Sequence, residues 1–259
     1  MSETKTLKQR IPILDEIRGL SVIVMIAYHT AFTWGNIFSL PVGKTMLAVL
    51  EPIHYVIPFP FVFISGICTK LSRSNLRRGL ILMIPALIIN AVTIVADKYI
   101  SGIAIYFGVI NMLSAVMILY GITGKYIEKL PSRLSFGVCM ILFMVTWGIK
   151  LEYMGIFGIR LVKMPEVLYK NKFMFPIGFP TRHFVSSDYF PLIPWFFLFL
   201  AGAYFADMMK HTSRLKSDKL YNRHSRFLEI VGKYALYIYI AHQPVIFALT
   251  YVYINFIGK

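Results

Sequence analysis

The sequence is poor in charge and in cysteine, and each shortage narrows the class of protein. Only 15% of the 259 residues are charged, whereas 57% are hydrophobic. A soluble domain of this size has too little core to bury that much apolar surface, so lipid must cover the remainder. The two cysteines, Cys68 and Cys139, both lie inside apolar runs, which favours buried thiols over a disulfide framework.

Several nucleotide and metal motifs are missing as well. The chain contains no GxxxxGK[ST] loop, no GxGxxG turn, no CxxC pair and no HExxH helix. Their absence argues against nucleotide hydrolysis, dinucleotide chemistry and structural zinc, so we expect no metal. Acidic residues are also scarce, because 12 Asp and Glu stand against 27 Lys and Arg, a formal net charge of +15. The basic residues form short clusters between apolar runs, which favours membrane orientation and anionic partners over nucleic acid.

Long apolar runs are what the sequence has in abundance. Seven of them approach the roughly 20 residues that a helix needs to cross a bilayer. They lie near 18–35, 54–69, 79–97, 103–122, 134–150, 189–208 and 232–256. The first run follows a basic stretch but ends in no small-x-small cleavage site, so we interpret it as a retained span. The sequence therefore predicts one all-α membrane domain over 1–259, an integral helical bundle with about seven transmembrane helices.

Basic residues predict the orientation of these spans. With the N-terminus in the cytoplasm, the inner segments carry 18 of the 27 lysines and arginines, and the outer segments carry 9. The positive-inside rule therefore favours a cytoplasmic N-terminus in a multi-pass protein of the cell membrane. The inner residues are Lys5, Lys8, Arg10, Arg18, Lys70, Arg73, Arg77, Arg78, Lys125, Lys129, Arg133, Lys210, Arg214, Lys216, Lys219, Arg223, Arg226 and Lys233. The outer 150–188 loop, rich in aromatics, either lies against the membrane or a site, or is a plain connector.

The first span, LDEIRGLSVIVMIAYHT, carries three polar residues on one helix face. The eleven steps from Arg18 to His29 turn the helix by about 1100°, roughly 20° beyond three full turns, so both side chains face the same way. Asp15 lies one turn before Arg18 and can pair with it. An ionisable residue as deep in the membrane as His29 suggests function. The alternative is a hydrogen bond to a neighbouring helix.

Other polar residues could complete a site with His29. His242, in the last span, lies at a similar depth and could line one cavity with His29, Asn90 and Asn111. His54 stands at the outer edge of the second span. For each histidine, a packing role without chemistry is the alternative.

The first inner loop, TKLSRSNLRRG, holds Arg73, Arg77 and Arg78 within six residues. With Arg18 and Lys70 these form a cytoplasmic basic cluster suited to phosphates. The alternative is that they anchor the chain to anionic membrane lipid and set its topology.

Several segments along the chain resemble known families. LDEIRGLSVIVMIAYH, with its Arg-x10-His spacing, resembles the opening of acyltransferase-3 type membrane acyltransferases. FPFVFISGICTKLSRSNLRRGL, IYFGVINMLSAVMILYG, YFPLIPWFFLFLAG and YIAHQPVI look like a sister family, the heparan-alpha-glucosaminide N-acetyltransferase-like catalytic domain. This resemblance runs over nearly the whole chain.

The resemblance implies a transmembrane acetyltransferase that takes acetyl-CoA, its co-substrate, from the cytoplasm. The acetyl group would go to a sugar or glycan amine or hydroxyl across the membrane. By motif, Arg18 and His29 correspond to the acyltransferase-3 Arg and His. In the lysosomal relatives the histidine assigned to acetyl transfer lies just before the FVF-type span, where His54 is the nearest histidine here. His29, His54 and His242 therefore stay candidates for catalysis.

Two other classes compete with an acetyltransferase. A small-molecule or lipid transporter would also need polar groups inside the membrane and proline-broken helices, but the sequence shows no inverted repeat. A non-catalytic membrane scaffold is the third possibility. Binding or hydrolysis of acetyl-CoA separates the enzyme from both. The sequence leaves the oligomeric state open, with a homodimer among the arrangements considered.

Overall fold

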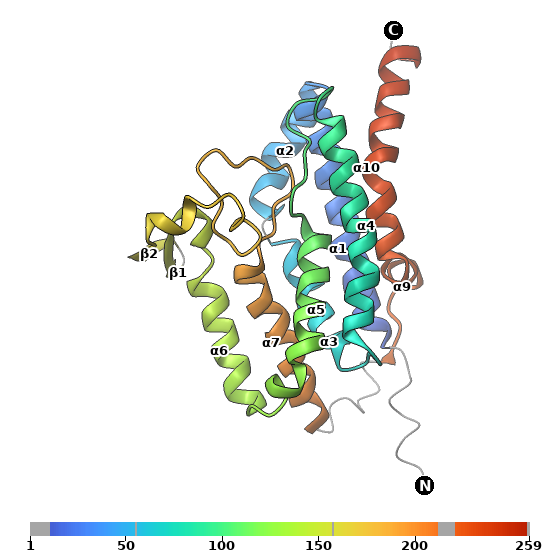
Figure 1. The fold of residues 1–259 in the computed structure, drawn as a ribbon. Helices are drawn as coiled ribbons and strands as arrows, with labels where there is room; N and C mark the ends of the chain where they lie inside the picture. The colour runs from blue at the N-terminus through green and yellow to red at the C-terminus, as the bar shows by residue number, and fades with distance from the viewer. Residues whose placement is uncertain (1–10, 55, 157, 212–220, 258–259) are drawn as a thin grey trace. The chain divides into compact units, whose positions relative to one another are not determined.

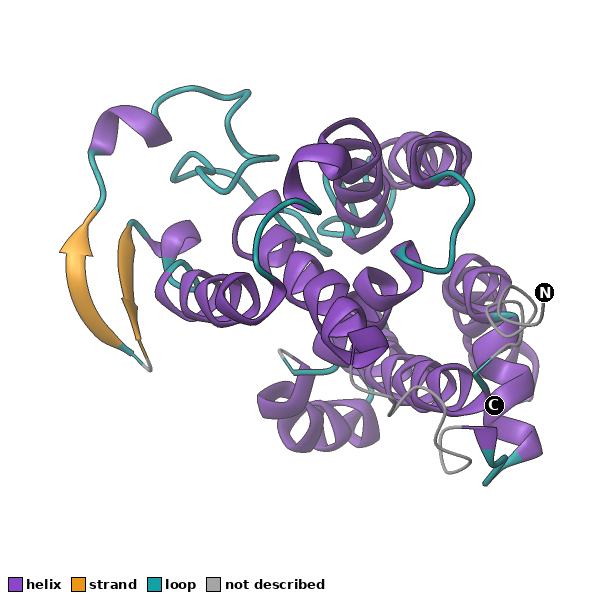
Figure 2. Ribbon diagram, turned by 90° about the horizontal axis from the view of Figure 1, so that it is seen from below, coloured by secondary structure: helices purple, strands orange, loops and turns teal. Residues whose placement is uncertain are grey.

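The computed structural model describes residues 11–54, 56–156, 158–211 and 221–257, and the described chain folds mainly into helices (Figure 1). Its α-helices are α1 (Pro12–Phe32), α2 (Pro41–His54), α3 (Pro58–Thr69), α4 (Asn75–Ala96), α5 (Val109–Ile127), α6 (Ser132–Val145), α7 (Leu192–His211), α9 (Arg226–Lys233) and α10 (Ala235–Val252). Short helical turns are η2 (Thr33–Ile37), η3 (Ile149–Leu151), η4 (Glu166–Tyr169) and η6 (Tyr253–Ile257). Strands β1 (Tyr153–Ile156) and β2 (Ile159–Lys163) pair antiparallel and form the only sheet within the described residues (Figure 2).

Among the described residues, six helices are long and apolar enough to cross a membrane. They cover Pro12–Ile37, Asn75–Ala96, Val109–Ile127, Ser132–Leu151, Leu192–Lys210 and Ala235–Phe256. The pair α2 and α3 passes the same test together, bent by 42°, and would make a seventh span. The exposed face of α4 is a stripe of large aliphatic side chains, among them Leu80, Ile84, Leu87 and Val95, as expected of a surface that lies against lipid. The predicted all-α membrane fold is therefore confirmed.

α2 and α9 lie where the sequence analysis expected connections between spans. α2 occupies residues placed in the first outer loop, and α3 begins at Pro58 rather than at 54. α2 and α3 are about 21 and 18 Å long, so each is too short to span a membrane alone. α9 lies inside the segment expected to be an inner loop. Lys5, Lys8, Arg10, Arg214, Lys216 and Lys219, which contributed to the orientation, lie outside the described residues.

The chain divides into two compact units. One comprises residues 1–61 and 215–259, and the other residues 62–214. In the first unit, α9 packs against α1 through two glycines: a Cβ on Gly19 would stand 2.1 Å from the carbonyl oxygen of Leu228, and one on Gly232 would stand 1.8 Å from that of Asp15. Small residues let two backbones approach this closely in a membrane.

The second unit uses the same device. A Cβ on Gly66 would stand 2.0 Å from the Phe199 carbonyl oxygen, which fixes α3 against α7. α4 packs against α5, where Ser114 donates a hydrogen bond to the Gly79 carbonyl at 2.8 Å. The 150–188 segment contains the β1–β2 hairpin and is tied down by hydrogen bonds, including one from Ser187 Oγ to the Ile103 carbonyl at 3.0 Å.

Candidate functional site

α1 positions the first group of candidate residues. Arg18 Nη1 lies 2.5 Å from Asp15 Oδ1, so the predicted ion pair is present, with the Asp15 carboxylate buried. The neighbouring Glu16, which the sequence analysis did not single out, is buried as well. Its Oε1 accepts backbone N–H groups of His224 at 2.7 Å and Ser225 at 3.1 Å, at the start of α9. A carboxylate at a helix N-terminus is favoured there, so Glu16 fastens α9 to α1.

The three candidate histidines gather in the first unit, although they come from three different helices. The ring centroids of His29 on α1 and His242 on α10 are 4.9 Å apart. His54, at the end of α2, stacks on Tyr28 with a centroid distance of 4.7 Å and an interplanar angle of 9°. Tyr28 in turn contacts the ring of its neighbour His29, at 5.6 Å. Residues far apart in the sequence thus form one cluster of aromatic and imidazole rings.

The hydrogen bonds of His242 fix its tautomer. Its Nδ1 lies within hydrogen-bond distance of the Tyr239 carbonyl oxygen, and a carbonyl only accepts, so Nδ1 carries the proton. In the neutral imidazole Nε2 is then a lone-pair acceptor. This atom is buried and has no hydrogen-bond partner among the described residues. This nitrogen is therefore an acceptor that a donor group of a bound molecule could pair with.

The remaining contacts between α1 and α10 are polar. Gln243 Nε2 donates to Thr33 Oγ1 at 3.0 Å, and Trp34 Nε1 donates to Thr250 Oγ1 at 2.9 Å. Thr33 and Trp34 lie in η2, a π-helical turn that continues α1 one turn beyond His29. Such wide turns often mark functional sites.

His54 also has a defined bond, because its Nδ1 lies 2.9 Å from the Glu51 carbonyl oxygen and must donate to it.

Asn90 and Asn111 belong to the second unit, and each bonds to the backbone there. Asn90 Nδ2 donates to the Tyr106 carbonyl at 3.1 Å, while Asn111 Oδ1 accepts the Gly108 N–H at 3.1 Å and caps α5. These bonds hold the start of α5 and the segment before it. A substrate-binding role for either residue stays a prediction.

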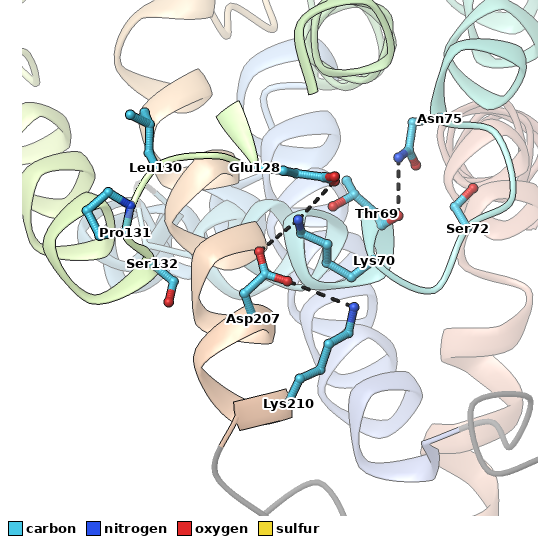
Figure 3. Close-up of a pocket in the computed structure, with 10 residues that line it drawn as sticks. All are labelled: Thr69, Lys70, Ser72, Asn75, Glu128, Leu130, Pro131, Ser132, Asp207 and Lys210. Atoms are coloured by element: carbon cyan, nitrogen blue, oxygen red, sulfur yellow. Dashed lines mark hydrogen bonds and ion pairs between the residues drawn. The ribbon is translucent and has the colours of Figure 1, made fainter. Parts of the chain in front are cut away.

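The predicted basic cluster separates into two kinds of residue. Arg73, Arg77 and Arg78, around the start of α4, are exposed and form no ion pair with another described residue. Lys70 is different: its ammonium is largely buried and lies 2.9 Å from Glu128 Oε1 and 2.7 Å from Asp207 Oδ2 (Figure 3). Two carboxylates balance its charge, so we leave it out of the phosphate-binding set.

The electrostatics of this triad follow from its contacts. Burial alone would lower the pKa of Lys70, but the hydrogen bonds to Asp207 and Glu128 outweigh it and raise that pKa. Burial would raise the pKa of Glu128, and the bond from Lys70 lowers it instead. The charged forms of both residues are thus favoured in the fold.

The triad borders a polar pocket of about 600 Å³ in the second unit (Figure 3). It opens among the end of α3, the α5–α6 connection and the end of α7. Its lining residues are Thr69, Lys70, Ser72, Asn75, Glu128, Leu130, Pro131, Ser132, Asp207 and Lys210. Two lysines and two carboxylates leave the pocket without a formal charge excess.

Residues 10–244 match the family described as heparan-alpha-glucosaminide N-acetyltransferase, catalytic. The chain belongs to this family. The match begins before α1, ends in α10, and includes all three histidines of the ring cluster. No curated protein and no solved structure matches the chain.

Membership of this acetyltransferase family agrees with the helices able to span a membrane. The chain is therefore a multi-pass membrane protein with an acetyltransferase-type catalytic domain. Within the part of the chain that the structure describes, no three His, Cys, Asp or Glu side chains lie together as metal ligands would.

Besides Glu16, sequence reasoning missed three residues around the histidines of the first unit, namely Tyr28, Thr33 and Gln243. Tyr28 links His54 to His29, and the other two form the bond beside His242. A tyrosine, a threonine and a glutamine inside apolar spans are common in membrane helices. Only the pairing of α1 with α10, which periodicity does not reveal, distinguishes them.

Proposed function

We propose that the protein is an acetyl-CoA-dependent membrane acetyltransferase that acetylates an amine or hydroxyl of a sugar. The observation that carries this proposal is the contact between His29 and His242, with the buried unpartnered Nε2 of His242, in a chain of this family. A packing role would pair this nitrogen with a donor from a neighbouring helix, and none of the described residues supplies one.

The chemistry follows from these groups. The N–H or O–H of the acceptor gives its proton to the His29–His242 pair, and the acceptor nitrogen or oxygen attacks the thioester carbonyl carbon. The carbon–sulfur bond then breaks, so the acetyl group is on the acceptor and the electron pair leaves with the CoA thiolate. The proton held by the histidine pair goes to that thiolate. Atoms and electrons balance in this transfer without an oxidant or a metal.

The cationic groups would hold the other end of the donor. Exposed guanidinium groups suit the phosphates of CoA because they bind two oxygens at once. We propose this role for the exposed Arg73, Arg77 and Arg78 of the second unit. Arg18 of the first unit, whose side chain already pairs with Asp15, is a separate prediction for the same role.

The proposal is tested by incubating the purified protein in detergent with acetyl-labelled acetyl-CoA and glucosamine as a probe. We expect one free CoA for each acetylated glucosamine, and only slow hydrolysis without the sugar. A transporter or a scaffold would neither bind nor hydrolyse acetyl-CoA. Intact acetyl-CoA after incubation with glucosamine and with a panel of hydroxyl sugars would overturn the proposal.

A further inference from the structure

The contact between α1 and α10 contains a second buried acceptor beside the histidine pair. Gln243 Oε1 is buried and, like His242 Nε2, has no hydrogen-bond partner among the described residues. An unpaired buried acceptor is destabilising, so natural proteins keep few of them without a purpose. Here two such atoms come from adjacent residues of one helix.

Both side chains point at the same face of α1. His242 contacts His29, and Gln243 Nε2 donates to Thr33 Oγ1 at 3.0 Å. Residues four apart on a helix lie above one another, so His29 and Thr33 share that face. Thr33 is fully buried, and its bond holds one end of the Gln243 amide in place. The other end, Oε1, is thereby oriented and left without a donor.

We infer that Gln243 is a specificity-determining residue, which accepts a hydrogen bond from the acyl acceptor while His242 Nε2 accepts the proton of the reacting group. This inference rests on the proposed function and adds to it a residue and a requirement on the substrate. The acceptor must carry at least two donor hydrogens close together, as an amino sugar or a polyol does. A substrate with one donor leaves one of the two buried acceptors unpaired and binds more weakly.

The test compares Gln243→Leu with the wild-type protein in steady-state acetylation of glucosamine. We expect the KM for glucosamine to rise about 5- to 20-fold, the range for loss of one buried hydrogen bond. The KM for acetyl-CoA and the rate of its hydrolysis without sugar should stay unchanged. Gln243→Glu, which keeps acceptor oxygens at this position, should recover part of the affinity for glucosamine.

Thr250→Val is the matched control. Thr250 lies buried in the same helix contact and accepts from Trp34 Nε1, but neither end of its hydroxyl is unpaired. Its loss should lower thermal stability and leave the KM for glucosamine unchanged. Thr33→Val serves as a second variant, because freeing the Gln243 amide should raise the KM for glucosamine in the same direction but by less.

Monodeoxy analogues of glucosamine identify the second donor. If Gln243 binds one hydroxyl, the analogue that lacks it binds the wild type more weakly, whereas Gln243→Leu does not distinguish it from glucosamine. Unchanged KM for glucosamine in Gln243→Leu, in a protein that does transfer acetyl groups, would overturn this inference alone. Absence of any transfer by the wild type would overturn the proposed function and this inference with it.

Discussion

At the scale of single residues, the proposed acetyl transfer depends on the ring contact between His29 and His242. Replacing either with Ala should lower kcat for acetyl transfer by about 10²–10⁴-fold, the usual contribution of a general base. Acetyl-CoA binding, measured by calorimetry, should change little because the phosphates bind elsewhere. His54→Ala should have a smaller effect, since the ring of His54 stacks on Tyr28.

The conservative substitution separates catalysis from packing. His29→Asn keeps a hydrogen-bonding side chain but no imidazole, so a packing role predicts retained activity and our account predicts its loss. Near-wild-type turnover in well-folded His29→Ala, with collapse in His54→Ala, would move the catalytic assignment to His54.

The sequence analysis selected the three histidines and suggested that His29 and His242 could line one cavity, but it did not predict the ring contacts that link His29, His242, Tyr28 and His54. An Arg-x10-His spacing shows that Arg18 and His29 share a helix face, because that depends only on helix geometry. The approach of His242 depends on how α10 packs against α1, and neither helix carries a local signal for it. The same reason explains why Glu16, Tyr28 and Gln243 were missed.

Lys70 provides a residue-scale prediction about pH. Glu128 has a lowered pKa, so its stabilisation is present above its unfolded pKa and is lost as pH falls through the folded one. Lys70 has a raised pKa, so its contribution is complete below its unfolded pKa and is lost as pH rises through the folded one. Lys70→Met should flatten the acidic side of the plot of stability against pH. It should also lower the free energy of unfolding by about 1–3 kcal/mol, a range that allows for the partial exposure of Glu128.

Thermal unfolding in detergent from about pH 8 down to about pH 3 measures the destabilisation at neutral pH and the flattened acidic side of the profile, because the lowered pKa of Glu128 places its loss of stability below about pH 4.5. The exposed pair of Lys163 and Glu166, at 3.2 Å, supplies the control, because Lys163→Met should change little. Identical pH profiles for Lys70→Met and the wild type would contradict the assignment.

At the scale of helices, the packing of α9 on α1 depends on two glycines. Gly232→Ala should destabilise the protein by about 1–3 kcal/mol, because the new Cβ meets the Asp15 carbonyl oxygen and the helices must separate. Gly137→Ala in α6 is the matched control, since nothing lies within 4 Å of its Cβ position, and it should be neutral or stabilising by up to about 1 kcal/mol. Equal melting temperatures for the two variants would show that α9 does not need the close approach.

The spans were predictable from the sequence, whereas α2 and α9 were not. A full apolar run of about 20 residues crosses the bilayer as a helix, because a helix satisfies its backbone hydrogen bonds within the segment itself. α2 is short, contains Pro52, and becomes part of a membrane crossing only together with α3. α9 has only eight residues; Ser225 caps its start, and the bonds from Glu16 and the glycine contacts hold it against α1. Elements that depend on tertiary contacts are those that sequence reasoning misses.

At the scale of the whole molecule, the contacts within the second unit agree with the predicted sidedness. The α3–α4 loop, the α5–α6 loop and the end of α7, all predicted to face the cytoplasm, meet around the Lys70 pocket. The α4–α5 connection and the end of the 150–188 loop, both predicted to face outward, are joined by Val109 N–H donating to Asp188 Oδ2 at 3.1 Å. Which of these two ends faces the cytoplasm stays a prediction from charge.

Single-cysteine labelling tests that orientation. In a background of Cys68→Ser and Cys139→Ala, an impermeant reagent outside intact cells should label Val185→Cys and should not label Lys129→Cys until the cells are opened. Both positions are exposed, so accessibility within the fold is matched. Strong labelling of Lys129→Cys in intact cells would reverse the predicted topology.

The central claim is acetyl transfer by this chain, and one reconstitution measures it directly. The purified protein is placed in sealed vesicles with glucosamine inside and labelled acetyl-CoA outside. We predict labelled N-acetylglucosamine inside the vesicles, CoA outside, and neither product with His29→Ala. No acetylated sugar in sealed vesicles or in vesicles opened with detergent, from protein whose helices have folded and inserted, would contradict the account.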